Sequence, residues 1–252
     1  MKFILPHIPL EITEFREPFV GGGSVFSAFK QTAGILPIAF WINDLNYDLY
    51  CFWKMARDRG DELVKTILEF RENYSNGREL YSYFTNQENE YSDFDRAVRF
   101  FILNRITFSG VVDSGGYSQK AFENRFTLSS VERLKELYPL LFDIKITHGD
   151  YESLLMTEGK NVFIFLDPPY WKATKSKLYG VKGDLHTSFD HERFANCLKK
   201  CQHRWLVTYD DSPKIRELFD FATIIEWELQ YGMNNYKQGS AAKGKELLIK
   251  NY

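Results

Sequence analysis

Four consecutive residues carry the sharpest chemical signal in the sequence. Asp167-Pro168-Pro169-Tyr170 directly follows Val162–Leu166, a continuous apolar run of the length of a buried strand. Because prolines cannot continue a central strand and favour an extended turn, we expect the Asp167 carboxylate and the Pro168 carbonyl to face one cleft. Two such acceptors can bind both hydrogens of an exocyclic amine, and Tyr170 offers an aromatic face to a flat ring. The alternative is an ordinary Asp-Pro turn after a strand.

Glycines and further carboxylates follow other strand candidates. Phe15–Val20 is followed by Gly21-Gly22-Gly23, Pro37–Ile42 by Asn43-Asp44, and Asp143–His148 by Gly149-Asp150-Tyr151. Ligands of open α/β sheets bind at the carboxyl ends of strands, so we predict that these residues line one edge with Asp167. Two alternatives remain open: the glycine turn is purely structural, or Asp44 caps the helix after it. The glycines form neither a dinucleotide fingerprint nor a phosphate loop with its lysine.

The elements that must position these residues alternate between strand and helix patterns. The strand candidates are Phe15–Val20, Pro37–Ile42, Asp143–His148, Val162–Leu166, Trp205–Tyr209, Thr223–Leu229 and Glu246–Lys250. Apolar stripes at helical spacing lie between most of them, and Ser212-Pro213 is a good helix start. The pattern predicts an α/β fold with an open, mostly parallel sheet of about seven strands, interrupted by an insertion of some 80 residues.

The insertion has a helical and loop-rich pattern. We expect helices over Asp61–Phe70 and Phe94–Arg105, and another after a capping box of Ser129 and Glu132 that Pro139 cuts short. The polar, glycine-rich segment between them, residues 109–124, predicts an exposed loop or hairpin. An excess of lysine and arginine over acids from residue 96 to 145 favours an anionic partner, although such charges also occur on merely solvated faces.

Composition excludes several classes of protein. The 252 residues are 44% hydrophobic and 26% charged, which is typical of a soluble globular chain, and the net charge of −2 excludes a uniformly basic coat for nucleic acid. No apolar run is long enough to span a membrane, so we expect a cytosolic protein. Cys51, Cys197 and Cys201 are interpreted as reduced core thiols, and the histidines show no metal-binding spacing.

The motifs together resemble those of the D12-class (Dam-type) DNA adenine N6-methyltransferases. The matching segments are FREPFVGGGS at 15–24, IND at 42–44, FILNRITFSG at 101–110, GDY at 149–151, DPPY at 167–170, WLVTYDD at 205–211 and ELLIKNY at 246–252. The resemblance therefore spans nearly the whole chain. It implies a Rossmann-like methyltransferase sheet with an inserted, mainly helical target-recognition subdomain.

The resemblance also implies roles for individual residues. The cofactor would be S-adenosylmethionine, leaving as S-adenosylhomocysteine, with no metal. Its binding residues would be Phe19, Gly21 and Gly23 under the methionine part, Asp44 on the ribose, Asp150 on the adenine amine, and Tyr151 and Asp167 beside them. Asp167, Pro168, Pro169 and Tyr170 would hold a target adenine flipped out of the duplex for direct in-line methyl transfer. No cysteine lies beside a proline, as cytosine C5 chemistry would require.

The resemblance divides the chain into two parts. Residues 1–60 and 146–252 would form the catalytic domain, and residues 61–145 the recognition subdomain. Candidate DNA contacts are Asn104, Arg105, Lys120, Arg125, Lys172, Lys175 and Lys177. We expect double-stranded DNA as partner in a prokaryotic or phage cytoplasm, a restriction endonuclease as a candidate partner protein, a monomer, and no membrane.

Two departures from the family pattern leave alternatives open. The aromatic-Gly-Gly-Lys segment that usually precedes the first strand is missing, and Val111-Val112-Asp113-Ser114 replaces an arginine-containing loop, so the recognition site GATC is not assigned. The alternatives are methylation of another planar amine, such as cytosine N4, RNA adenine or a protein glutamine, and a catalytically silent DNA-binding relic.

Overall fold

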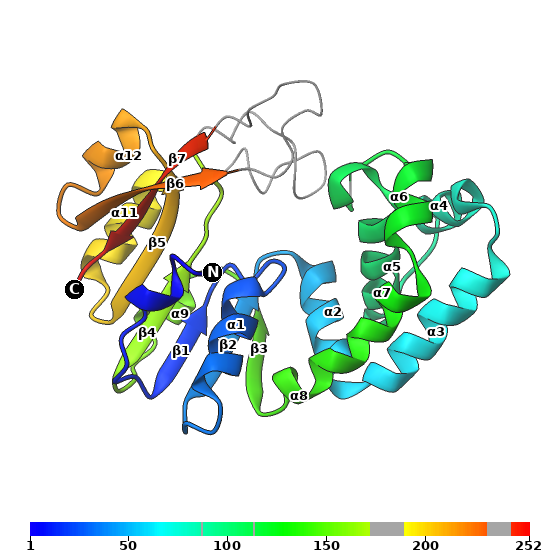
Figure 1. The fold of residues 1–252 in the computed structure, drawn as a ribbon, viewed down its shortest axis with the longest axis horizontal. Coiled ribbons are helices and arrows are strands. Elements are labelled where there is room, and N and C mark those ends of the chain that lie inside the picture. The colour runs from blue at the N-terminus through cyan, green and yellow to red at the C-terminus, as the bar shows by residue number, and fades with distance from the viewer. Residues whose placement is uncertain (87, 113, 172–188, 231–242) are drawn as a thin grey trace. The chain divides into compact units, whose positions relative to one another are not determined.

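A seven-stranded sheet is the framework of the protein (Figure 1). The computed structural model describes residues 1–86, 88–112, 114–171, 189–230 and 243–252. The strands are β1 (Glu14–Glu17), β2 (Ala39–Asp44), β3 (Ile144–His148), β4 (Val162–Leu166), β5 (Arg204–Asp210), β6 (Thr223–Gln230) and β7 (Lys243–Lys250). Their order is β3-β2-β1-β4-β5-β7-β6. The predicted α/β class and the seven strands are confirmed.

The strand directions place the carboxyl ends of four strands at one edge of the sheet. β1 pairs in parallel with β2 and β4, and β4 pairs in parallel with β5, so the carboxyl ends of these four strands point the same way. β7 is antiparallel and lies between β5 and β6. Every residue of β4 is buried, which agrees with the continuous apolar run that predicts it.

The described residues form two compact units. The first comprises residues 1–42, 150–171 and those from 189 onward, and the second comprises residues 43–149. The helices of the first unit are α1 (Ser24–Ala33), α9 (Glu152–Met156), α11 (His191–Lys200) and α12 (Pro213–Leu218), with a 3₁₀ turn at Leu5–His7. Ser212 caps α12 with Pro213 in its first turn, as predicted.

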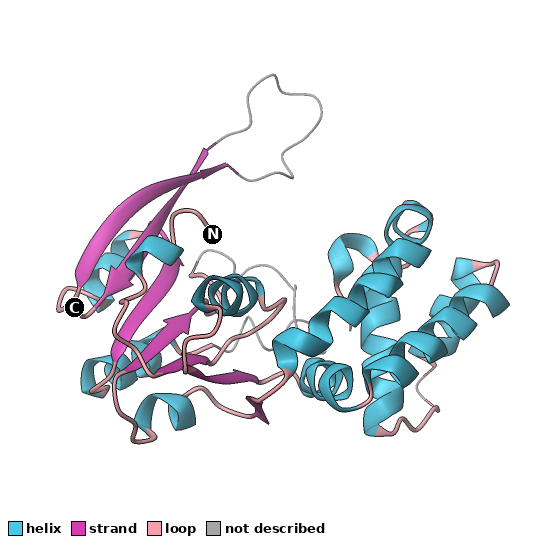
Figure 2. Cartoon of the chain, turned by 60° about the horizontal axis from the view of Figure 1, so that its bottom comes forward, coloured by secondary structure: helices cyan, strands magenta, loops and turns pink. Residues whose placement is uncertain are grey.

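The second unit is mainly helical (Figure 2). Its helices are α2 (Tyr47–Asp58), α3 (Gly60–Asn73), α4 (Gly77–Thr85), α5 (Asp93–Ile106), α6 (Gln119–Arg125), α7 (Leu128–Glu132) and α8 (Leu137–Leu141), with 3₁₀ turns at Phe108–Gly110 and Arg133–Glu136. Asp48 of α2 accepts hydrogen bonds from Arg96 and Arg99 of α5. These contacts place α2 in this unit, whose first residue is 43. The assignment of residues 61–145 to DNA recognition stays a prediction.

Three local predictions for the insertion were wrong. Residues 119–125 form α6 rather than a loop, because Ser118 caps the helix and Ala121 and Phe122 are buried. Thr127, not Ser129, caps α7, together with Ser130. Pro139 does not cut a helix short, because it lies in the first turn of α8, where its missing N–H has no partner to lose.

The structure agrees with the interpretation of the three cysteines as core thiols. All three cysteines are buried and none forms a disulfide, and burial raises the pKa of each thiol. Within the described parts of the chain, every helix is too short or too polar to cross a bilayer.

Candidate active site

Asp167 lies at the carboxyl end of β4 and is held there by its neighbour strand. The register that pairs Leu166 with Val207 brings Thr208 of β5 alongside Asp167, and the Thr208 hydroxyl donates a hydrogen bond of 2.5 Å to Asp167 Oδ1. The Asp167 side chain is exposed to solvent on one side, but nearby protein atoms remove part of its hydration. This partial desolvation raises the pKa of Asp167, while hydrogen bonds from Thr208 and Tyr170 favour its ionised form. The next residue, Pro168, is buried.

Tyr170 is backed by a buried aromatic pair. Its ring centre lies 6.0 Å from that of Tyr209, which is fully buried. The Tyr209 hydroxyl is 2.8 Å from Nδ1 of His191, and the His191 ring packs edge-on to Trp171. Burial raises the pKa of Tyr209 and lowers that of His191, so both groups are neutral near pH 7. The pair therefore supports Tyr170 without adding charge to the site.

The glycine turn after β1 leaves open space beside the backbone. Gly21 has φ of +47° and Gly23 has φ of +66°, values that favour glycine. Among the described residues, a Cβ atom added at Gly21 or Gly22 would meet no atom within 4 Å beyond the neighbouring residues of the chain. Gly23 is also the N-cap residue of α1, which begins at Ser24. This open space is compatible with the close approach of a ligand, which stays a prediction for the turn.

Two residues of the predicted cofactor set contact one another. The ring centres of Phe19 and Tyr151 are 5.5 Å apart, and both rings pack against Phe189 and Phe194. Tyr151 is 6% exposed, so its burial raises the pKa of its phenol. Phe19 is only half-buried, which leaves part of its ring available to a ligand.

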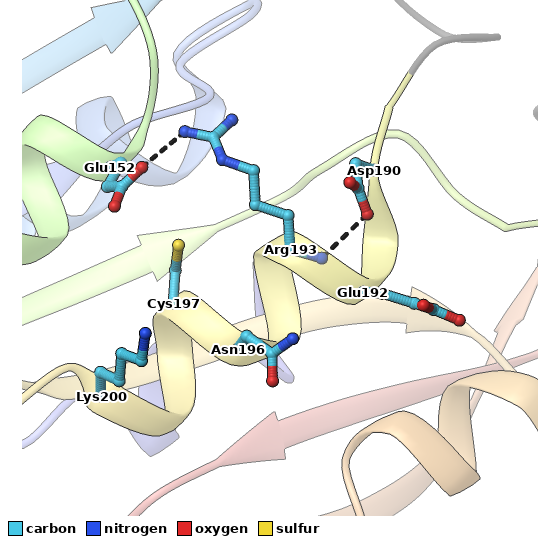
Figure 3. Close-up of a pocket in the computed structure, with 7 residues that line it drawn as sticks. All are labelled: Glu152, Asp190, Glu192, Arg193, Asn196, Cys197 and Lys200. Atoms are coloured by element: carbon cyan, nitrogen blue, oxygen red, sulfur yellow. Dashed lines mark hydrogen bonds and ion pairs between the residues drawn. The ribbon is translucent and has the colours of Figure 1, made fainter.

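Asp150 has a partner that the sequence did not reveal. Arg193 of α11 donates to both carboxylate oxygens, at 2.9 and 3.0 Å, and also to Glu152 at 2.5 Å. Arg193 stands in no motif, and more than 40 residues separate it from Asp150. Figure 3 shows it beside Glu152 in a surface pocket of about 470 Å³.

Asp44 is the last residue of β2, and its carboxylate does not cap the following helix. The side chain of Asn46 caps α2 by accepting from the backbone N–H of Leu49. Asp44 Oδ1 instead accepts from the backbone N–H of Asn46 and thereby fixes the turn. Helix capping, the alternative role for Asp44, is therefore wrong.

The candidate DNA contacts in the second unit have mixed environments. Asn104 donates to the carbonyl of Gly110, Arg125 donates to the carbonyl of Thr107, and Lys120 is exposed. The Arg105 guanidinium lies over the ring of Phe101, with a buried Nε that has no hydrogen-bond partner among the described residues. Lys172, Lys175 and Lys177 lie outside the described residues.

Arg105 belongs to a group of like charges. Burial lowers its pKa, and the nearby charges of Arg125 and Arg133 lower it further. Within the described residues, these three arginines form no ion pair with an acid. In the same part of the chain, no cluster of histidine, cysteine and acidic side chains has metal-site geometry.

A sheet with parallel central strands, a glycine turn and carboxylates at strand ends defines a class of nucleotide-binding enzyme folds, and comparison with known proteins identifies the family. The model of the D12 class N6 adenine-specific DNA methyltransferases matches residues 1–233. A type II methyltransferase of Lactococcus lactis subsp. cremoris is 24% identical over 99% of this chain and 91% of its own length. A DNA adenine methylase of Escherichia coli strain K12 is 36% identical over 61% of this chain and 55% of its own length.

The chain belongs to the D12 class of N6 adenine-specific DNA methyltransferases. It is a transferase that methylates adenine in DNA, and membership implies the use of S-adenosylmethionine. The resemblance in the sequence is thus confirmed for the family, the reaction and the fold. The roles of individual residues stay proposals.

Proposed function

We propose that the carboxyl edge of the sheet transfers a methyl group from S-adenosylmethionine to N6 of an adenine flipped out of double-stranded DNA. The observation that carries this proposal is the Asp167 carboxylate, which Thr208 and Tyr170 hold beside the buried Pro168 at the end of β4. Two fixed acceptors next to an aromatic ring match the NH₂ group and the flat ring of adenine.

The residues around the glycine turn fit the cofactor. The open space beside Gly21 suits the methionine part, the half-buried ring of Phe19 adds apolar contact, and the carboxylates of Asp44 and Asp150 suit ribose hydroxyls and an adenine amine. Tyr151 supports this surface from its buried position against Phe19. When bound, the cofactor supplies an electrophilic sulfonium methyl group.

The target adenine needs help because its N6 lone pair is delocalised into the ring. Hydrogen bonds from the NH₂ group to the Asp167 carboxylate and the Pro168 carbonyl favour a pyramidal nitrogen with a localised lone pair. The negative charge of Asp167 also stabilises the positive charge that develops on nitrogen during attack. Pro168 and Pro169 fix the turn, and Tyr170 stacks on the base, so the nitrogen is held for direct in-line transfer.

Residues 61–145, which lie within the second unit, are the proposed recognition subdomain for duplex DNA. Arg105, Arg125 and Arg133 supply positive charge without an acidic partner among the described residues, which suits DNA phosphates. Asn104 and Lys120 are further candidate contacts, and so are Lys172, Lys175 and Lys177.

We further propose that the enzyme acts as a monomer, that its product is S-adenosylhomocysteine, and that it can serve with a restriction endonuclease.

The substitution Asp167→Asn tests the proposed role of the carboxylate. It keeps the size of the side chain but removes the charge, so we expect kcat for methyl transfer to fall by about 100-fold or more. The Kd for S-adenosylhomocysteine, measured by calorimetry, should change by less than about threefold.

Asp220→Asn is the matched control, because Asp220 is an exposed aspartate in the turn after α12. It should retain full activity. Undiminished transfer by Asp167→Asn would refute the proposed chemistry.

A further inference from the structure

One guanidinium group holds three consecutive residues of the first unit. Arg193 Nη1 lies 2.9 Å from Asp150 Oδ2, and Nη2 lies 3.0 Å from Asp150 Oδ1 and 2.5 Å from Glu152 Oε2. The same group lies over the ring of Tyr151, 5.1 Å from its centre. Arg193 thus contacts the side chains of Asp150, Tyr151 and Glu152, which follow one another in a single turn.

The helix that carries Arg193 is itself fixed against this turn. Asp190 caps α11 by accepting a 2.8 Å hydrogen bond from the backbone N–H of Arg193 (Figure 3). The next residue, Phe194, is fully buried, and its ring meets that of Tyr151 edge-on with centres 5.1 Å apart. The guanidinium therefore starts from a rigid position, which reduces the entropy lost when it orients a partner.

The hydrogen bonds leave the two oxygens of Asp150 unequal. Oδ1 accepts from Arg193 Nη2 and from the backbone N–H of Glu152, so both of its lone pairs are used. Oδ2 accepts only from Arg193 Nη1 among the described residues. One acceptor position on Oδ2 is left, and the bidentate contact fixes the plane in which it lies.

From this geometry we infer that Arg193 is a positioning residue for the cofactor: it orients Asp150 so that Oδ2 accepts the exocyclic amine of the cofactor's adenine. This inference rests on the proposed role of Asp150 in cofactor binding. The fixed orientation of Asp150 Oδ2 also gives selectivity for an amine. A ligand with a carbonyl oxygen in place of the amine would bring that oxygen against a fixed acceptor and be repelled.

The charge state of Asp150 agrees with this role. Partial burial works against ionisation of the carboxyl, but hydrogen bonds from Arg193 and from the backbone N–H of Glu152 outweigh it and lower the pKa of Asp150. The acceptor is therefore ionised throughout the neutral range.

The test compares two ligands that differ at the 6-position of the purine, where an oxo group replaces the amine and N1 changes from acceptor to donor. S-adenosylhomocysteine and S-inosylhomocysteine are titrated by calorimetry into the wild-type chain, Arg193→Ala and Arg193→Gln. We expect Arg193→Ala to raise the Kd for the adenosyl ligand about three- to tenfold, to leave the inosyl ligand nearly unchanged, and to leave kcat at saturating cofactor unchanged. Arg193→Gln keeps part of the aliphatic side chain but removes the guanidinium, so the same two Kd values can be measured on it if the alanine variant is unstable.

Lys214→Ala is the matched control. The Lys214 ammonium of α12 pairs at 3.3 Å with Glu192 of α11, the helix that carries Arg193, and does not contact Asp150. It should bind both ligands as the wild type does. Equal weakening of both ligands by Arg193→Ala would indicate a merely structural role, and unchanged Kd values would indicate no role; either result overturns the inference.

Asp150→Asn separates this inference from the proposed function. If that variant loses discrimination between the two ligands but Arg193→Ala keeps it, only the role of Arg193 fails. If Asp150→Asn itself keeps the discrimination, the assignment of Asp150 to the cofactor amine fails, and the role of Arg193 falls with it.

Discussion

At the scale of single residues, Asp167 and Asp150 are each held by a side chain that is distant in the sequence. Asp167 is recognisable because two prolines follow it after a buried run. Its donor Thr208 lies 41 residues away, and Arg193 lies 43 residues from Asp150. Such pairs are set by strand register and helix packing rather than by local spacing, so no sequence motif predicts them. The same holds for His191, which reaches Tyr209 across 18 residues.

Thr208→Val tests the support of Asp167 at this scale. The carboxylate must be ionised to accept the target amine, so the transfer rate should fall as the pH drops through the pKa of Asp167, which partial desolvation raises. Removing the hydroxyl removes a hydrogen bond that favours the ionised form, so this acid limb should move to higher pH. The measurement is kcat/KM against pH, and an acid limb that does not move would show that Thr208 does not control Asp167.

At the scale of elements, continuous apolar runs predict strands well because both faces of the central strands are buried. Val162–Leu166 is matched at both ends by β4. The insertion is harder to predict, because its helices bury narrow faces and are flanked by polar residues. Residues 109–124 illustrate this: their polarity predicts a loop, but the burial of Ala121 and Phe122 stabilises α6.

Arg16→Ala tests how β1 holds the segment that carries Asp150. Arg16 is 1% exposed and donates to the carbonyl of Leu154 within α9 and to those of Thr157 and Glu158 just after it. Its loss removes one hydrogen bond from each of these carbonyls, although Thr157 O keeps its contact with His203 Nε2 at 2.9 Å. We therefore expect a loss of about 2 to 4 kcal/mol in the free energy of unfolding.

Urea denaturation measures this change in stability. Arg204→Ala removes a single exposed hydrogen bond to the carbonyl of Glu11 and serves as control, with an expected loss below about 1 kcal/mol. Equal losses in the two variants would show that Arg16 does not fix α9.

At the scale of the whole molecule, net charge conceals the local charge that DNA binding needs. The chain carries −2 overall, but Arg105, Arg125 and Arg133 lie close enough for their charges to interact. Composition predicts an anionic partner only in general terms. Which arginines come together depends on the folding of α5, α6 and the turn that begins at Arg133.

Arg133→Ala tests the proposed binding of DNA phosphates. Removing one arginine–phosphate interaction should reduce the slope of log K against log salt by about one, so the variant should bind duplex DNA with a shallower salt dependence. Fluorescence anisotropy at several salt concentrations measures the slope. Lys65→Ala removes an exposed lysine paired with Glu69 and should leave the slope unchanged; an unchanged slope for Arg133→Ala would exclude an interaction of Arg133 with phosphate.

The most direct test of adenine methylation follows the methyl group itself. Labelled S-adenosylmethionine is incubated with the protein and DNA free of methylation, and the DNA is then digested to nucleosides and separated. We predict that the label appears in N6-methyldeoxyadenosine. Label in N4-methyldeoxycytidine, or no label although the protein binds both cofactor and DNA, would contradict adenine methylation by this chain.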